Sequence, residues 1–393
     1  MNILIHAHEF NIKEGGPCTK RMKSFAEAFC NAGHNVTIIT SSHNKMNEIK
    51  FDFKYNIKYS YSTKKIKGST FQRLSNNLIF GITSFFKAIF CIGKIDIVIS
   101  TSPPPLISIF AYLISKVKRA KLVYDVRDIW PDVALEMGSF TKKSIYYKVF
   151  KYIADFMYKK SNYITTVSPG KMKKLKEYCK NFKKVWYIPN GIDDDFLNFN
   201  IDKDIINEYN LNKKFTIIYI GNVGLAQNLD AMVDLAKNNV NNNNIQFLIF
   251  GEGAYKNKLT EKIKKLSLNN IFVLGKIDYS KVYTLLKYSK ISFISLKNNN
   301  MQDSIPTKMF DALGVGCPVL LLAKGDSVKI LEESKLGEHA ENIEQLNAKL
   351  NYMLKNYQQY ESRKNDCIKY IVNNYSRKRI AQGLEEKVIK NVK

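Results

Sequence analysis

Short apolar runs alternate with segments of helical period along almost all of this 393-residue chain. Runs such as residues 3–5 and 215–220 have the length of buried strands, and the segments between them repeat apolar residues every three or four positions. Strands that alternate with helices form parallel sheets covered by helices. The sequence therefore predicts an α/β chain with two Rossmann-like, doubly wound parallel-sheet domains that face each other across a cleft.

The domain boundaries follow from where this alternation pauses. A Pro-Asn-Gly turn at residues 189–191 closes the first series, and a polar stretch at 198–212 precedes the second. We expect an N-terminal domain over residues 1–197 and a second domain over residues 198–373, with 198–212 as a linker. Residues 374–393 are expected to form a C-terminal helix that packs back on the first domain.

The formal net charge of +26 narrows the classes of partner. Such an excess favours a polyanionic partner, which could be a nucleic acid, an anionic membrane or a phosphorylated substrate. A Lys-rich composition inherited from a biased genome explains the charge equally well. No helix-turn-helix, zinc or RNP pattern supports nucleic acid, so we expect no nucleic-acid partner.

Cysteine usage and apolar runs bear on compartment and metal binding. The six cysteines form no CxxC pair, which predicts free thiols in a reducing compartment and no metal site. The N-terminal residues lack the basic and apolar regions of a signal peptide, and no run reaches the roughly 20 apolar residues that span a bilayer. We therefore expect a cytoplasmic protein, either soluble or peripheral.

Residues 303–318 combine two carboxylates with a helix start. Asp303 and Asp311 stand on either side of Pro306, and Thr307 is a plausible N-cap for the helix that follows. A helix N-terminus binds anions, and a carboxylate one turn further along could chelate a diol such as a ribose. The alternative is an ordinary loop, helix and strand with two surface acids.

Two further positions lie where open α/β sheets bind ligands. Gly15-Gly16 precedes a helix and permits close backbone approach, but it is no G-x-G-x-x-G fingerprint, so a dinucleotide site is not expected. Arg127 and Asp128 follow a predicted strand, at the edge where ligands bind. They could equally pair with each other.

Two predicted apolar helices could pack inside the protein or contact a membrane. Residues 71–93 are strongly apolar, which predicts either a buried helix or a surface that dips into a membrane. Residues 142–160 interleave lysines with aromatic and aliphatic residues at helical spacing. That pattern fits an anionic membrane surface and an ordinary packed helix equally well.

Several motifs, in this order, resemble those of family 4 glycosyltransferases, which have the GT-B fold. They are the Gly15-Gly16 loop, AGHNV at 32–36, PNGID at 189–193, GEG at 251–253, and Asp303 to Asp311 with the tail ALGVGCPV at 312–319. Asp replaces both Glu residues of the family's E-x7-E element. A narrower likeness rests on RDIWP at 127–131, GNVGLAQ at 221–227 and IPTK at 305–308. These are similar to the N-acetyl-fucosaminyl and related aminosugar transferases of O-antigen, lipopolysaccharide and capsule biosynthesis.

The resemblance implies a retaining, metal-independent glycosyltransferase without a cofactor. Its donor would be a nucleotide sugar, with UDP expected, bound by the second domain. The acceptor would be a polyprenyl-diphosphate-linked or growing glycan, bound by the first domain at the inner face of an anionic cytoplasmic membrane. A GDP-sugar donor, or a nucleotide-sugar epimerase of the same fold, is the alternative.

The resemblance and the chemistry of the residues together give a set of site residues. The catalytic candidates are Asp128, Arg127 and Asp303. The substrate-binding candidates are Gly15, Gly16, Asn190, Gly221, Asn222, Gln227, Gly251, Ile305, Thr307, Lys308 and Asp311. Many family members hold the diphosphate with an Arg and a Lys near the positions of Asn222 and Gln227, which leaves Lys308 as the nearest cation.

Overall fold

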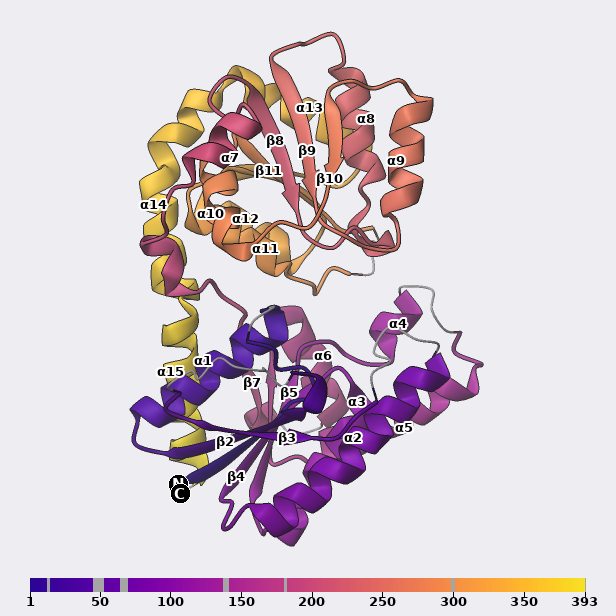
Figure 1. Ribbon diagram of the computed structural model, residues 1–393, viewed down its shortest axis with the longest axis vertical. Helices are drawn as coiled ribbons and strands as arrows, with labels where there is room; N and C mark the ends of the chain where they lie inside the picture. Colours follow the sequence, from indigo (N-terminus) through magenta and orange to yellow (C-terminus); the bar gives the residue numbers. More distant parts are fainter. Residues whose placement is uncertain are drawn as a thin grey trace. The chain divides into compact units, whose positions relative to one another are not determined.

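The computed structural model describes residues 1–12, 15–44, 53–63, 70–136, 141–179, 182–297 and 301–392. The chain forms two compact units, one made of Met1–Asn190 with Arg377–Lys393 and the other of Gly191–Ser376. Each unit contains one parallel sheet with helices packed against it (Figure 1). The predicted α/β class with two doubly wound parallel sheets is confirmed.

Unit 1 contains a seven-stranded sheet in the order β3-β2-β1-β4-β5-β6-β7. Its strands are β1 (Asn2–His6), β2 (Asn35–Ser41), β3 (Asn56–Ser60), β4 (Ile97–Ser102), β5 (Lys121–Val126), β6 (Tyr163–Thr166) and β7 (Val185–Tyr187). Its helices are α1 (Pro17–Asn31), α2 (Thr70–Cys91), α3 (Pro105–Val117), α4 (Asp132–Glu136), α5 (Ile145–Lys160), α6 (Pro169–Cys179) and α15 (Arg377–Val392). Every residue of β4 is buried, as expected for a central strand with helices on both faces.

Helix α1 shows how local sequence sets element ends in this unit. Gly16 precedes it at φ 107°, and Pro17 occupies its first position, where a missing N–H costs nothing. Gly33 ends it at φ 82°, and the N–H of His34 donates to the carbonyl of Phe29. Gly33 thus forms a left-handed C-terminal cap, which glycine adopts without steric cost.

Helix α15 completes the core of unit 1 from the other end of the chain. Ala381, Leu384 and Val388 are fully buried and belong to the same apolar cluster as Phe25 and Phe29 of α1. In Figure 1 the yellow α15 lies beside the indigo α1. Unit 1 is therefore built from both ends of the sequence.

Unit 2 contains a six-stranded sheet in the order β10-β9-β8-β11-β12-β13. Its strands are β8 (Phe215–Ile220), β9 (Ile245–Phe250), β10 (Ile271–Leu274), β11 (Ile291–Ser295), β12 (Val319–Leu322) and β13 (Gly337–Ala340). Its helices are α7 (Lys203–Glu208), α8 (Asp230–Asn238), α9 (Lys256–Lys265), α10 (Tyr279–Tyr288), α11 (Thr307–Gly314), α12 (Asp326–Ser334), α13 (Ile343–Lys355) and α14 (Tyr357–Tyr375).

The stretch expected as a linker, residues 198–212, is instead partly helical. Asp202 caps α7 by accepting a hydrogen bond from the N–H of Ile205 at 3.1 Å. Ile205 and Ile206 then pack into the core of unit 2, together with Phe196. Because these apolar residues belong to unit 2, the chain leaves unit 1 after Asn190, a few residues before the expected boundary at 197/198.

The strand order of unit 2 creates a switch point. The chain runs outward from β8 through β9 to β10, then returns to the other side of β8 to form β11. Helices that follow β8 and β11 therefore diverge to opposite faces, which opens a crevice at the carboxyl ends of these two strands. Open α/β sheets bind ligands in such a crevice.

Candidate functional site

Two glycine turns lie back to back at the switch point of unit 2. The N–H of Gly221 donates to the carbonyl of Phe250 at 3.0 Å, and the N–H of Val223 donates to the carbonyl of Glu252 at 2.9 Å. Gly251 has φ 149°, and a β-carbon there would collide with the carbonyl oxygen of Gly221. Only glycine at 251 lets the turns that follow β8 and β9 approach this closely.

Lys308 reaches this turn from the first turn of α11. Its Nζ lies 3.9 Å from the centre of the Tyr219 ring, and a β-carbon at Gly221 would lie only 3.3 Å from that atom. The Lys308 side chain is partly exposed, but its Nζ is buried and has no hydrogen-bond partner among the described residues. Burial lowers the pKa of Lys308 to about 7. An anion at the turn would supply the partner that this amine lacks.

Asn222 and Gln227 converge on the same turn. A β-carbon at Gly224 would lie 2.6 Å from Nδ2 of Asn222 and 2.8 Å from Oε1 of Gln227. The Tyr219 hydroxyl donates to the carbonyl of Asn222 at 2.7 Å and so fixes the turn. Within the described ranges, Oε1 of Gln227 is buried without a partner. The structure thus gathers five predicted residues, Gly221, Asn222, Gln227, Gly251 and Lys308, in one place.

The N-terminus of α11 is built differently from the prediction. Thr307 is the first helical residue and not the N-cap, because Pro306 takes the extended cap conformation. No side chain in the described parts of the chain caps this end, so the N–H groups of the first turn have no side-chain partner. The helix start therefore keeps the anion-binding character that the sequence predicts.

The two carboxylates of this segment have different surroundings. Asp311 lies one helical turn after Lys308 and accepts a hydrogen bond from the Tyr279 hydroxyl at 3.3 Å. Tyr279 in turn lies 2.7 Å from the hydroxyl of Tyr283. Asp303 is buried, with 8% of its surface exposed. Tyr279 was not predicted, because a lone tyrosine in sequence carries no sign of the carboxylate it contacts.

Ile305 and the apolar residues of α11 anchor this segment in the core of unit 2. Ile305 is buried, and so are Met309, Phe310, Ala312 and Leu313, as the helical period predicts. Burial of these side chains holds Thr307, Lys308 and Asp311 on the opposite, more accessible side of the helix.

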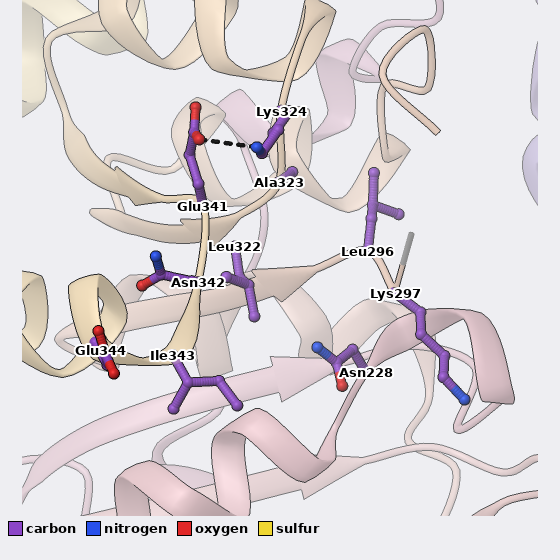
Figure 2. A pocket seen from close by; sticks show the side chains of 10 residues that line it. All are labelled: Asn228, Leu296, Lys297, Leu322, Ala323, Lys324, Glu341, Asn342, Ile343 and Glu344. Carbon is purple, nitrogen blue, oxygen red and sulfur yellow. Dashed lines mark ion pairs between the residues drawn. The ribbon is translucent and has the colours of Figure 1, made fainter. Parts of the chain in front are cut away.

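A cavity of about 440 Å³ opens at the carboxyl ends of β11, β12 and β13 (Figure 2). Its lining residues are Asn228, Leu296, Lys297, Leu322, Ala323, Lys324, Glu341, Asn342, Ile343 and Glu344. Lys324 and Glu341 form an ion pair at 2.9 Å. The N–H of Lys297 donates to the carbonyl of Ala226 at 2.9 Å, so the cavity adjoins the turn that carries Gln227.

In unit 1, Arg127 and Asp128 turn to different partners and not to each other. Arg127 donates from Nε to the Thr101 hydroxyl and from Nη2 to the carbonyl of Pro103, both at 3.0 Å. Asp128 lies 3.5 Å from Nζ of Lys171, which is buried on α6, while 40% of the Asp128 side chain is exposed. Arg127 thus braces the loop after β4, and Asp128 presents an accessible carboxylate with a buried cation behind it.

The Gly15-Gly16 turn has room for a ligand. Its residues have φ 69° and 107°, and a β-carbon at either would meet no atom of the described residues within 4 Å. No side chain in the described part of the chain caps the helix that follows. The N–H of Gly15 donates to the carbonyl of Asn11 at 3.0 Å, so the N–H groups that the segment offers a ligand are those at the start of α1.

Asn190 has a structural partner. Its Oδ1 accepts a hydrogen bond from Arg21 at 3.3 Å, and the carbonyl of Pro189 accepts another at 2.8 Å. Arg21 itself is paired with buried Asp125. The sequence did not reveal Arg21 or Asp125, because 104 residues separate them and neither belongs to a local motif.

Among the residues that the structure describes, no three His, Cys, Asp or Glu side chains are placed to hold a metal ion. The six cysteines are all free thiols, as predicted.

Comparisons with known proteins place the chain. Residues 19–196 match the family described as Glycosyltransferase Family 4, and residues 201–372 match Glycosyl transferases group 1. The probable glycosyltransferase WbjE of Pseudomonas aeruginosa is 22% identical over 251 residues, which are 62% of this chain and 61% of that protein. An uncharacterized glycosyltransferase of Methanocaldococcus jannaschii is 26% identical over 184 residues, which are 46% of this chain and 44% of that protein. The chain thus matches less than two thirds of the length of either relative.

Solved structures share the fold over the whole chain. Anabaena HepE in complex with UDP-glucose is 11% identical, with a TM-score of 0.74, and the match covers 99% of this chain and 100% of that one. Sucrose-phosphate synthase from Thermosynechococcus elongatus is 12% identical, with a TM-score of 0.81 and coverage of 99% and 98%. The two family models both describe glycosyltransferases and together span most of the sequence, and the solved structures share the fold of this chain.

Proposed function

We propose that the protein transfers a sugar from a nucleotide-sugar donor to an acceptor hydroxyl. The observation that carries this proposal is the amine of Lys308, which has no hydrogen-bond partner among the described residues. It lies beside the Gly221 turn, at the start of α11, which no side chain of the described residues caps. A nucleoside diphosphate that leaves a sugar gathers negative charge on its oxygens. Cations and N–H groups already aimed at those oxygens stabilise the transition state without any reorganisation.

The donor we propose is UDP-linked. Asp311 chelates the ribose diol, with Tyr279 orienting its carboxylate, while Asn222, Gln227 and Lys308 surround the diphosphate. HepE, which shares the fold, has been solved with UDP-glucose. A GDP-sugar remains the alternative, because none of these residues is proposed to contact the nucleotide base.

The sugar and its surroundings follow from the motif likeness. We propose an N-acetylated deoxy-aminosugar such as N-acetyl-fucosamine, facing Asp303, with Ile305, Thr307 and Gly251 shaping the site around it. The RDIWP and IPTK motifs at 127–131 and 305–308 support this narrower choice.

On the acceptor side, Asp128 is the group that orients or deprotonates the attacking hydroxyl. Nζ of Lys171 lies 3.5 Å from that carboxylate and positions it, and Arg127 fixes the loop after β4. We expect the Gly15-Gly16 turn, with the N–H groups at the start of α1, to bind an anionic group of a substrate. Transfer proceeds with retention at the anomeric carbon and uses neither a metal ion nor a cofactor.

We propose a polyprenyl-diphosphate-linked glycan of a surface polysaccharide, such as O-antigen or capsule, as acceptor. Such a lipid places the reaction at the cytoplasmic face of an anionic membrane. The net charge of +26 supports a peripheral protein there.

A thermal-shift panel tests the donor half of this proposal. UDP-, GDP-, ADP- and dTDP-sugars are added to the wild type and to Lys308→Met. Ligand that binds only the folded state raises the melting temperature, and we expect a rise of about a few degrees for UDP-sugars that the variant loses. If no sugar nucleotide stabilises the wild type, the proposed function is wrong.

Incubation with donor alone separates transfer from epimerisation. A transferase leaves the sugar nucleotide unchanged, apart from slow hydrolysis, until an acceptor is added. Rapid conversion of the donor into an isomer without acceptor would show that the protein is an epimerase.

A further inference from the structure

Helix α2 exposes a row of apolar side chains. Leu78, Ile82, Phe86 and Phe90 occur at every fourth position and are 44%, 41%, 53% and 78% exposed. Residues four apart lie on the same side of a helix, so these side chains form one stripe. The rings of Phe86 and Phe90 stack along it at 6.1 Å between centres.

Helices α3 and α5 carry similar stripes. Leu113 and Val117 are exposed on α3. On α5 the exposed residues are Ile145, Val149 and Tyr152, the last with 75% of its surface in solvent. Their spacing again follows one side of each helix.

The three stripes belong to one surface, because the helices pack side by side. Gly81 of α2 lies directly against the ring of Phe110 on α3, where a β-carbon would collide. Tyr112 of α3 meets Phe156 of α5 edge to face at 5.0 Å. Figure 1 shows α2, α3 and α5 in one layer of unit 1. Apolar surface of this extent is unusual on a protein without a partner.

Contrary to the expectation from the sequence, one helix of the described residues, α2, is long and apolar enough over Gln72–Cys91 to cross a bilayer, by length and composition. Its inner side, however, is tied to the sheet. Ser84 lies 2.8 Å from Nε2 of His6 on β1, and Lys87 donates to the carbonyl of Tyr59 on β3 at 2.6 Å. A helix fixed in this way is not free to cross a bilayer. The buried helix that the sequence predicts as one alternative describes only this inner side.

The charges of the three helices decide what covers them. Together α2, α3 and α5 contain seven basic residues and one acidic residue, Asp155, which pairs with Lys151 at 3.2 Å. Lys116, Lys148, Lys159 and Lys160 are exposed. Apolar stripes with lysines beside them match the boundary between acyl chains and anionic headgroups.

We propose that the outward face of α2, α3 and α5 docks unit 1 on an anionic lipid bilayer, with Phe86 and Phe90 inserted among the acyl chains. This surface joins the two segments for which the sequence suggests membrane contact, residues 71–93 and 142–160, through α3. It deepens the peripheral location proposed above. Its test uses no sugar substrate, so its failure leaves the transfer reaction untouched.

Co-sedimentation with vesicles tests the surface. The wild type is expected to sediment with phosphatidylcholine vesicles that contain phosphatidylglycerol, and much less with phosphatidylcholine alone. The double variant Phe86→Glu/Phe90→Glu is expected to lose about tenfold or more in partitioning, because two large apolar side chains no longer insert. The matched control is Phe272→Glu, which changes a 42% exposed phenylalanine of unit 2 and is expected to bind like the wild type.

Two outcomes overturn the proposal. One is equal sedimentation of the double variant and the wild type, or no sedimentation of the wild type with anionic vesicles. The other is a lipid-free dimer, seen by analytical ultracentrifugation, that the double variant abolishes, because a second copy of the chain would then cover this face. Should the double variant fail to fold, Phe90→Trp replaces it. Its added fluorescence must shift to the blue with anionic vesicles, and an unchanged spectrum rejects the proposal.

Discussion

Arg21 and Asp125 form an ion pair at 2.8 Å with both side chains almost fully buried. The hydroxyls of Thr101 and Thr165 donate to the same carboxylate, and Arg21 also donates to the carbonyls of Ile188 and Pro189. Burial alone would raise the pKa of Asp125, but Arg21 and Thr165 hold that pKa below its usual value. The pair therefore joins α1, the end of β5 and the segment that leaves unit 1.

Removing the cation should destabilise unit 1. Arg21→Met leaves a buried carboxylate without its partner, and we expect the free energy of unfolding to fall by about 3–5 kcal/mol. Denaturant unfolding measures it. Lys23→Met, on the same helix, breaks only an exposed pair with Glu27 and should change stability by less than about 0.5 kcal/mol. Equal effects of the two variants would refute the structural role of the pair.

Asp311 is expected to dominate affinity for the nucleotide. Asp311→Asn should weaken UDP binding about tenfold to a hundredfold, because hydrogen bonds from a ribose diol to a charged acceptor are lost. Tyr279→Phe removes only the hydroxyl that orients the carboxylate, so its loss should be smaller, up to about tenfold. Calorimetry measures both. An unchanged UDP affinity in Asp311→Asn would exclude this carboxylate as a ligand.

Lys308 should link donor binding to pH. Its pKa, about 7 against an ordinary value of 10.5, rises when a diphosphate becomes its partner, so UDP binding takes up a proton above pH 7. Affinity should therefore fall as the pH rises from 7 to about 9, by up to about tenfold per unit. In the ligand-free protein, the stability of the fold changes with pH in the opposite direction to the affinity for UDP. The stability that this group contributes is present above its unfolded pKa and is lost as the pH falls toward 7.

Two lysine variants test whether Lys308 is the source of this pH dependence. Lys308→Met should bind UDP weakly with no such slope. Lys256→Met, which removes an amine paired with Glu252 in the neighbouring turn, should keep the slope. Calorimetry in buffers of different ionisation enthalpy counts the protons. A wild type without proton uptake at pH 8 would contradict the assignment.

Asp128 should act on turnover more than on donor affinity. Asp128→Asn is expected to lower kcat by about a hundredfold or more, with the donor KM nearly unchanged. Lys171→Met should lower kcat by a smaller factor, about tenfold, because the buried amine that positions the carboxylate is lost. Lys174→Met, one turn along α6, is the control and should leave kcat unchanged. A loss of donor affinity with normal turnover would reverse the assignment.

The sequence predicted what depends on neighbours along the chain. Strand β8 begins and ends at the expected residues, 215 and 220, because it is a continuous apolar run. The helix expected after Pro306 is α11, and its apolar residues, repeated at helical spacing, form its buried side. Local patterning carries enough information for such features.

The sequence failed where a residue's role depends on distant parts of the fold. Strand β13 has no apolar run and forms only because β12 lies beside it. Thr307 lost the cap position because Pro306 already provides the extended backbone that a cap needs. The pairing of Asp128 with Lys171 joins residues from different elements, so neither partner signals the other.

The packing of α15 against α1 has a consequence for synthesis on the ribosome. The strands of unit 1 emerge first, but the helix that covers Phe25 and Phe29 emerges only after all of unit 2. Until then the growing chain exposes the apolar groove that Ala381, Leu384 and Val388 later fill. Unit 2 can fold completely before α15 is synthesised. The unit that is translated first is therefore the last to complete its core.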